Sequence, residues 1–107
     1  QEFTVNVPVG EYDPSILGFC GTKSGRDTDK IRDLGLTTVD SDVVQTPGIC
    51  QLPLTLECRV IYQQQQDLSC LPQNITDRFY PAVNDEGFRD YHIAYYGEIV
   101  NAYLIEP

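Results

Sequence analysis

The chain has 107 residues, 41% of them hydrophobic, which is enough for one hydrophobic core and so for one domain or part of one. Seven Lys and Arg residues against 16 Asp and Glu residues give a net charge of −9, which argues against nucleic acids and anionic membrane surfaces as partners. No apolar run approaches the length needed to span a bilayer. The class of function that remains is one that acts on small molecules.

The first predicted elements are a strand and a short helix. Glu2 to Val7 places apolar residues at alternate positions, which predicts a half-buried strand. A short helix should follow, because Asp13 can cap it and Pro14 suits its first position. This helix should deliver Cys20 and Gly21 to the loop that comes next.

Segment 20–30 combines small, hydroxyl and basic residues, in the order Cys-Gly-Thr-Lys-Ser-Gly-Arg-Asp-Thr-Asp-Lys. Its glycines let backbone N–H groups approach a ligand, and its hydroxyls are further donors. A helix expected from about Asp27 to Leu34 would present its positive dipole end. Lys23 and Arg26 add full charges on an acidic chain, and Arg has the planar fork that suits phosphate. The group that fits this segment is a phosphate.

The same segment is also compatible with an ordinary capped turn. Ser24 or Asp27 would then be the N-cap of the short helix, and Gly35 would be its C-terminal stop. The spacing matches neither the Walker loop nor the dinucleotide fingerprint. The residues alone therefore leave both interpretations open.

The middle of the chain predicts mainly strands. Leu36 to Val39 is a brief extended segment, and Leu52 to Tyr62 alternates apolar and polar residues over a long strand. One face of this long strand should be core, and the other should be wet or line a polar site. Gln63 to Gln66 is expected at a turn or a fraying strand end. Asn74 has sequon form but is expected at the N-terminus of a helix from Ile75 to Tyr80.

The last predicted strand, Tyr91 to Leu104, follows a charged loop from Asn84 to Asp90. Gly97 interrupts the strand at a position where a bulge or a close approach is expected. Three tyrosines of one parity are expected in the core or in a dimer interface. They are Tyr91, Tyr95 and Tyr103.

The cysteines and the single histidine predict no metal site. Cys20, Cys50, Cys58 and Cys70 are widely spaced and form no Cys-x-x-Cys pair, and His92 does not complete a zinc set. Cys58 lies on an apolar strand face, where a buried free thiol is the usual outcome. Reduced thiols in the cytoplasm are favoured, and a secreted domain with two disulfides is the alternative.

Six short motifs follow one another in a recognisable order. They are Phe3-Thr4-Val5-Asn6-Val7-Pro8, segment 20–30, Gly35-Leu36-Thr37, Leu56-Glu57-Cys58, Phe79-Tyr80-Pro81 and His92 to Val100. Together they resemble the second half of the flavin reductase-like, FMN-binding split-barrel family, and within it the flavoredoxin-like branch. The resemblance runs from about residue 2 to residue 104, and its most specific block is Cys-Gly-x-x-Ser-Gly-Arg-x-x-Asp-Lys.

The resemblance implies a mixed, mainly β fold that is part of a split β-barrel, with short helices packed on it. Residues 1–107 would form a single domain, the C-terminal portion of a split-barrel domain. Family members begin with strands that carry much of the flavin contact surface, and those strands are not in this sequence. We therefore expect a fragment, with a proteolysed product or a truncated relative as alternatives, and apolar edges that favour association.

The resemblance also implies an FMN-dependent oxidoreductase, either an NAD(P)H:flavin reductase or a flavoredoxin-like electron-transfer flavoprotein. FMN would be the cofactor and NAD(P)H the electron donor of a cytoplasmic homodimer, with flavin bound where two barrels meet. The activity of the 107-residue piece alone is left open. The alternative function is a truncated, non-catalytic split-barrel module that binds a partner chain or another anionic ligand.

By resemblance, five consecutive residues surround the flavin phosphate and ribityl chain. They are Thr22, Lys23, Ser24, Gly25 and Arg26. Cys20, Lys30 and His92 are outer candidates, and a structural role is an equal alternative for His92. No catalytic residue is assigned, because hydride transfer to a flavin requires no general acid or base from the protein.

Overall fold

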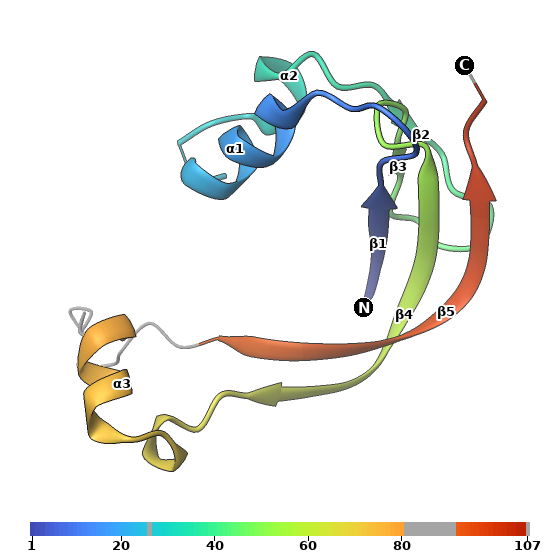
Figure 1. Ribbon diagram of the computed structural model, residues 1–107. Helices are drawn as coiled ribbons and strands as arrows, with labels where there is room; N and C mark the ends of the chain where they lie inside the picture. The colour runs from blue at the N-terminus through green and yellow to red at the C-terminus, as the bar shows by residue number, and fades with distance from the viewer. Residues whose placement is uncertain (26, 81–91, 107) are drawn as a thin grey trace. The chain divides into compact units, whose positions relative to one another are not determined.

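The computed structural model describes residues 1–25, 27–80 and 92–106 (Figure 1). One sheet has the strand order β1-β4-β5, formed by β1 (Glu2–Val7), β4 (Leu54–Gln65) and β5 (Ile93–Leu104). A second sheet pairs β2 (Thr38–Val39) with β3 (Gly48–Ile49). The helices are α1 (Pro14–Thr22), α2 (Lys30–Asp33) and α3 (Gln73–Phe79), with a 3-10 turn at Leu68–Cys70.

The chain forms two compact units. The larger unit contains residues 1–60 and 97–107, and the smaller unit contains residues 61–96. Each unit therefore includes part of β4 and part of β5. Within the described residues neither sheet closes into a barrel. No helix in this part of the chain is both long and apolar enough to cross a membrane.

The first strand and the first helix form where the sequence predicts them. β1 has the predicted bounds and pairs antiparallel with β4, so that Thr4 lies opposite Glu57. Asp13 caps α1 by accepting a hydrogen bond from the N–H of Ser15 at 2.9 Å, and a proline occupies the first turn. Local capping chemistry therefore decides where α1 begins.

The second helix is much shorter than the predicted Asp27 to Leu34. α2 covers four residues, and its N-cap is Asp29, whose carboxylate accepts from the N–H of Arg32 at 3.2 Å. Gly35 ends the helix as predicted, because its φ of +64° is a conformation that glycine adopts without strain.

Asp27 and Thr28 bond to the backbone of Ser24 before α2 begins, and Asp29 is the cap, so the predicted caps at Ser24 and Asp27 are wrong. The N–H groups of Asp27 and Thr28 both donate to the carbonyl of Ser24 at 3.1 Å. A turn that uses this carbonyl in place of the Ser24 side chain postpones the helix until Asp29 can cap it.

The later boundaries shift by a few residues. β4 begins after Pro53 and continues to Gln65, so most of the glutamine run belongs to the strand. α3 begins after Pro72 without a side-chain cap, and Asn74 therefore lies inside its first turn. The charged loop predicted at 84–90 lies outside the described residues, as does Tyr91.

The polar face of β4 is the more deeply buried one. Thr55 and Glu57 are both 0% exposed, whereas Leu54 and Leu56 remain partly exposed. The sequence predicted the opposite, with the apolar face as the core. Cys58 of that apolar face is nevertheless buried, as predicted, with 3% exposure.

Segment 41–49 covers this polar face, and the carboxylate of Glu57 holds it there. Oε1 of Glu57 accepts from the N–H groups of Val43 and Val44, each at 2.7 Å, and Oε2 accepts from the side-chain amide of Asn101. Burial alone would raise the pKa of this carboxyl. The N–H groups of the segment and the amide of Asn101 outweigh burial and lower the pKa.

Other polar contacts join segment 41–49 to all three strands of the main sheet. The hydroxyl of Thr4 on β1 donates to the carbonyl of Pro47 at 2.9 Å, and the hydroxyls of Ser41 and Tyr103 lie 3.1 Å apart. Gly48 passes directly beneath Tyr103, where a Cβ would collide with the tyrosine hydroxyl. The segment therefore follows the sheet closely enough to exclude side chains at this point.

Gly97 is a point of close approach, as predicted. A Cβ built on it would lie 2.8 Å from Cε1 of Phe3 and 3.2 Å from Cβ of Cys58. The ring of Phe3 therefore occupies the space that any larger residue at position 97 would need.

Replacing Glu57 by Gln should lower the melting temperature by about 10 °C and flatten the dependence of stability on acid. Glutamine keeps the shape, but it is a weaker acceptor and places an NH₂ group among donors. Because the pKa is lowered in the folded state, the stability that the carboxylate contributes is complete at neutral pH. It is lost as the pH falls below the ordinary value of 4.5. Thermal unfolding from neutral pH to about pH 3 measures both effects.

Glu98→Gln is the matched control, because Glu98 is exposed on β5 within the same unit. This variant should keep the wild-type melting temperature and pH profile. Identical pH profiles for wild type and Glu57→Gln would contradict the role given to the buried carboxylate.

Candidate functional site

The predicted phosphate segment begins inside α1 and not at a helix start. Cys20, Gly21 and Thr22 form the end of α1, and Lys23 is its C-cap, with its N–H donating to the carbonyl of Phe19 at 3.1 Å. This end carries the negative pole of the helix dipole, which disfavours an anion. The four residues of α2 are too few for an effective positive pole. The expected contribution of a helix N-terminus is therefore wrong, and side chains must supply the positive charge.

Lys30 satisfies the C-terminal end of α1. Its Nζ donates to the carbonyl of Cys20 at 2.8 Å, and the residue is partly buried. A cation in this position pairs a carbonyl that has no partner within the helix and opposes the negative pole. The structure thus uses Lys30 to join the two ends of segment 20–30.

One hydroxyl predicted as a ligand donor serves the backbone instead. Thr22 Oγ1 donates to the carbonyl of Gly18 at 2.7 Å, one turn earlier in α1. Thr28 Oγ1 donates to the carbonyl of Ser24 at 2.9 Å and reinforces the turn there. A hydroxyl has a single hydrogen, so neither threonine has a donor left for an anion in this arrangement.

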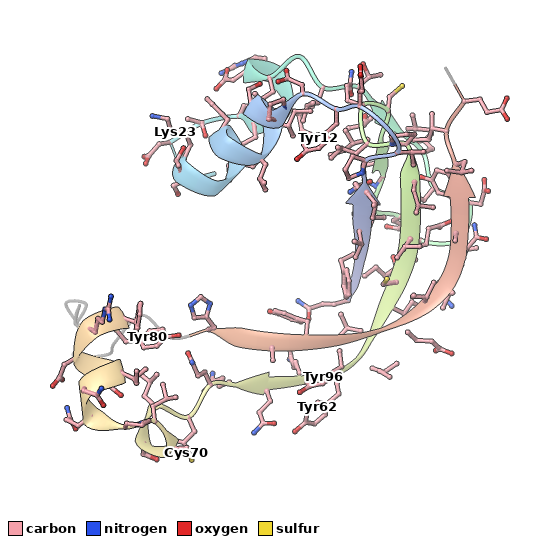
Figure 2. All side chains as sticks on the ribbon, in the orientation of Figure 1. Tyr12, Lys23, Tyr62, Cys70, Tyr80 and Tyr96 are labelled. Atoms are coloured by element: carbon pink, nitrogen blue, oxygen red, sulfur yellow. The ribbon has the colours of Figure 1, made fainter. Side chains whose placement is uncertain are left out.

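Lys23 and two glycines remain available for a ligand. Lys23 is exposed, and its ammonium has no ion pair or hydrogen bond with any other described residue. Figure 2 shows its nitrogen directed away from α1. A Cβ built on Gly21 or Gly25 meets nothing within 4 Å, and neither glycine has a positive φ. The fold itself therefore requires glycine at neither position. Arg26 lies outside the described residues.

An apolar hollow of about 260 Å³ lies against the same helix. Its lining residues are Asn6, Pro8, Tyr12, Ile16, Leu17, Cys20 and Leu52. Tyr12 is 46% exposed and Leu17 is 70% exposed, so the apolar side of α1 is only partly covered. Cys20 belongs both to this hollow and to segment 20–30. An apolar hollow and a cation carried by the same helix are features that a small-molecule site can combine.

His92 belongs to the smaller unit, where it is tied to the end of β4 and to the residue after α3. Its backbone N–H donates to Oε1 of Gln66 at 3.0 Å, and its carbonyl accepts from the N–H of Gln66 at 2.8 Å. The Gln66 amide also donates to the hydroxyl of Tyr80 at 3.1 Å. The rings of Tyr80 and His92 meet edge to face, with centroids 5.6 Å apart. These contacts give His92 a structural role.

The smaller unit has an open hollow of about 420 Å³ where β4 ends and β5 begins. Its lining residues are Gln64, Gln65, Gln66, Asp67, Cys70, His92, Ile93 and Ala94. The sequence placed Gln66 at a turn or a fraying strand end and gave it no other role, because its partners Tyr80 and His92 are 14 and 26 positions away and a glutamine run carries no positional signal. The glutamine is nevertheless the residue that connects the strand ends here.

Aromatic residues of the smaller unit are more exposed than the sequence predicts for a core. The rings of Tyr62 and Tyr96 lie 5.3 Å apart, and these residues are 52% and 53% exposed (Figure 2). Tyr95 is 47% exposed and Ile61 is 68% exposed. Of the two alternatives for Tyr95, core and interface, its exposure excludes the core within this chain. Tyr103 is half-buried, and its hydroxyl lies 3.1 Å from that of Ser41.

Six of the eight predicted site residues lie together in the described part of the larger unit. They are Cys20, Thr22, Lys23, Ser24, Gly25 and Lys30. Tyr12 and Leu17 join them through the hollow that Cys20 lines, and the sequence assigned neither residue to the site. Exposed apolar residues near a cationic segment are the signal that would have identified both.

Solved structures with a similar fold include two larger proteins. The crystal structure of nitrilotriacetate monooxygenase component B from Bacillus cereus aligns with a TM-score of 0.60 at 18% identity, over 98% of this chain and 43% of that chain. Flavoredoxin of Desulfovibrio vulgaris (Miyazaki F) aligns with a TM-score of 0.52 at 22% identity, over 94% of this chain and 61% of that chain. No protein-family model and no curated protein matches the sequence.

At these identities the likeness shows the fold alone. The predicted mixed, mainly β architecture is confirmed by the strands and helices of the described residues and by both alignments. The chain spans less than two thirds of each of these proteins. The split-barrel assignment is consistent with the open sheet and stays a prediction.

Proposed function

We propose that this chain is the phosphate-binding part of an FMN-dependent oxidoreductase. The whole protein would be either an NAD(P)H:flavin reductase or a flavoredoxin-like electron-transfer flavoprotein. The fold likeness to a flavoredoxin and to a monooxygenase component supports this class. The observation that carries the proposal is the exposed ammonium of Lys23, which has no partner among the described residues and lies between two glycines that the fold does not require.

The residues present fit the chemistry of FMN. The phosphate would lie at Lys23, and the absence of a Cβ at Gly21 and Gly25 would let it approach the backbone. Ser24 and Arg26 are proposed as further phosphate contacts from the resemblance. When bound, FMN supplies hydride acceptance from NAD(P)H and electron transfer to an acceptor. The protein's part is to bind the phosphate, orient the ring and exclude water.

Thr22 and Cys20 have different parts in this proposal. Thr22 keeps its hydrogen on the carbonyl of Gly18, so its oxygen can only accept a hydrogen bond, for example from a ribityl hydroxyl. Cys20 lines the apolar hollow, where it would contact an apolar part of the ligand. His92 is proposed as an outer contact only, because its backbone and ring already have structural partners.

A cytoplasmic homodimer completes the proposal. The exposed rings of Tyr62, Tyr95 and Tyr96 supply apolar surface that a second copy would cover. The described cysteines form no disulfide with one another, and a location where thiols stay reduced is proposed with the nicotinamide donor.

A non-catalytic module that binds a partner chain or another anionic ligand is the second candidate. The exposure of Leu17 and Ile61 favours it, because such apolar surface also suits a protein partner. Colour distinguishes the two candidates. A flavoprotein purifies yellow and bleaches when a nicotinamide donor is added, whereas the module does neither.

Replacing Lys23 by Ala should weaken FMN binding by about 1.5–3 kcal/mol, because a charge-assisted contact to the phosphate is lost. Binding of riboflavin, which lacks the phosphate, should not change. Quenching of flavin fluorescence in titrations of both ligands measures the difference.

Arg32→Ala is the matched control, since this arginine is exposed on α2 and pairs only weakly with Asp33 at 3.4 Å. It should leave the affinity for FMN within about a factor of two. An Lys23→Ala variant that binds FMN as tightly as wild type would rule out the phosphate assignment.

Replacing Gly25 by Ala should weaken FMN binding without destabilising the fold. Apart from its chain neighbours, no described residue lies within 4 Å of the added methyl group, so the melting temperature should stay within about 3 °C of wild type. In the Gly25→Ala variant this methyl group would occupy the space through which the phosphate approaches the backbone. Gly18→Ala, with equally open space on α1, is the control and should leave FMN binding intact. Equal affinity of the Gly25→Ala variant and wild type would contradict this close approach.

A further inference from the structure

We propose that Lys30 is a positioning residue for the flavin phosphate, which acts by closing segment 20–30 through its contact with Cys20 and so fixing the place of Lys23. This inference rests on the proposed function. It gives Lys30 a different role from that of the outer binding-site candidate which the family resemblance suggests.

The contact of Lys30 joins the two ends of the segment. The distance of 2.8 Å between Nζ of Lys30 and the carbonyl oxygen of Cys20 spans ten residues of sequence. One partner lies near the end of α1 and the other begins α2. Both residues are partly buried, and a partly buried ammonium keeps such a partner because leaving it unpaired is costly.

Backbone groups hold other described residues of the segment. The N–H of Lys23 is held by the carbonyl of Phe19 at 3.1 Å. The carbonyl of Ser24 accepts from the N–H and from the hydroxyl of Thr28, at 3.1 and 2.9 Å. Lys23 is therefore held at the last turn of α1, and the contact of Lys30 with the carbonyl of Cys20 supports that same turn. The position of Lys23 depends on both contacts.

The charge of Lys30 acts on the end of α1. Its ammonium opposes the negative pole that the last carbonyl groups of the helix form, and so stabilises the turn that ends at Lys23. The neighbouring carboxylate of Asp29 is engaged as the cap of α2. A neutral residue at position 30 would remove the ammonium from the carbonyl of Cys20 and loosen the end of α1.

A double-mutant cycle separates positioning from direct contact. Wild type, Lys23→Met, Lys30→Met and the double variant of the full 107-residue chain are titrated with FMN and with riboflavin. If Lys30 acts through Lys23, Lys30→Met weakens FMN binding about tenfold, and the double variant binds FMN no more weakly than Lys23→Met does. Riboflavin binding stays the same in all four proteins.

A variant that restores the charge at position 30 adds a second measurement, the recovery of FMN affinity. Lys30→Arg keeps the charge and a donor for the carbonyl of Cys20, and it should restore FMN affinity to within about threefold of wild type. Lys30→Gln replaces Lys30→Met in the same cycle if the methionine variant does not fold. Melting temperatures of all variants are measured alongside.

Two results would overturn this inference and leave the proposed function standing. One is an unchanged FMN affinity in Lys30→Met, and the other is a double variant in which the two losses multiply, as expected for direct contacts. A wild-type chain that binds FMN no better than riboflavin would overturn the proposed phosphate site itself, and this inference with it.

Discussion

The buried carboxylate of Glu57 is the contact on which the larger unit depends. It accepts hydrogen bonds from Val43, Val44 and Asn101, and so attaches segment 41–49 to the sheet. A charged group with no exposure is tolerated only because these donors are present. Polar contacts therefore determine how segment 41–49 packs on this face of the sheet. The leucines of β4 lie on the other face and are only partly buried.

The covered sheet is connected to the candidate site through Asn6. Its Oδ1 accepts from the N–H of Ile49 at 3.2 Å, at the end of segment 41–49, and the residue also lines the apolar hollow beside α1. Cys20 lines the same hollow and offers its carbonyl to Lys30. The buried carboxylate, the apolar hollow and the contact between Cys20 and Lys30 therefore belong to one connected part of the larger unit, and Lys23 follows Cys20 at the end of the same helix.

Local chemistry could be predicted from the sequence, and distant contacts could not. The bounds of β1, the Asp13 cap and the stop at Gly35 each depend on a few neighbouring residues, and all were predicted correctly. The start of α2 was missed because a turn on the carbonyl of Ser24 competes with capping. The burial of Glu57 and the partner of Lys30 depend on residues ten or more positions away, about which alternation and spacing carry no information.

The most direct measurement compares backbone amide shifts in ¹⁵N-correlated NMR spectra after addition of FMN or riboflavin. The difference between the two ligands reports the phosphate alone. The account predicts that this difference is concentrated at Gly21, Lys23 and Gly25, with smaller changes at Phe19. A difference centred on the residues around His92, or no difference at any amide, would contradict the claim that segment 20–30 binds the phosphate.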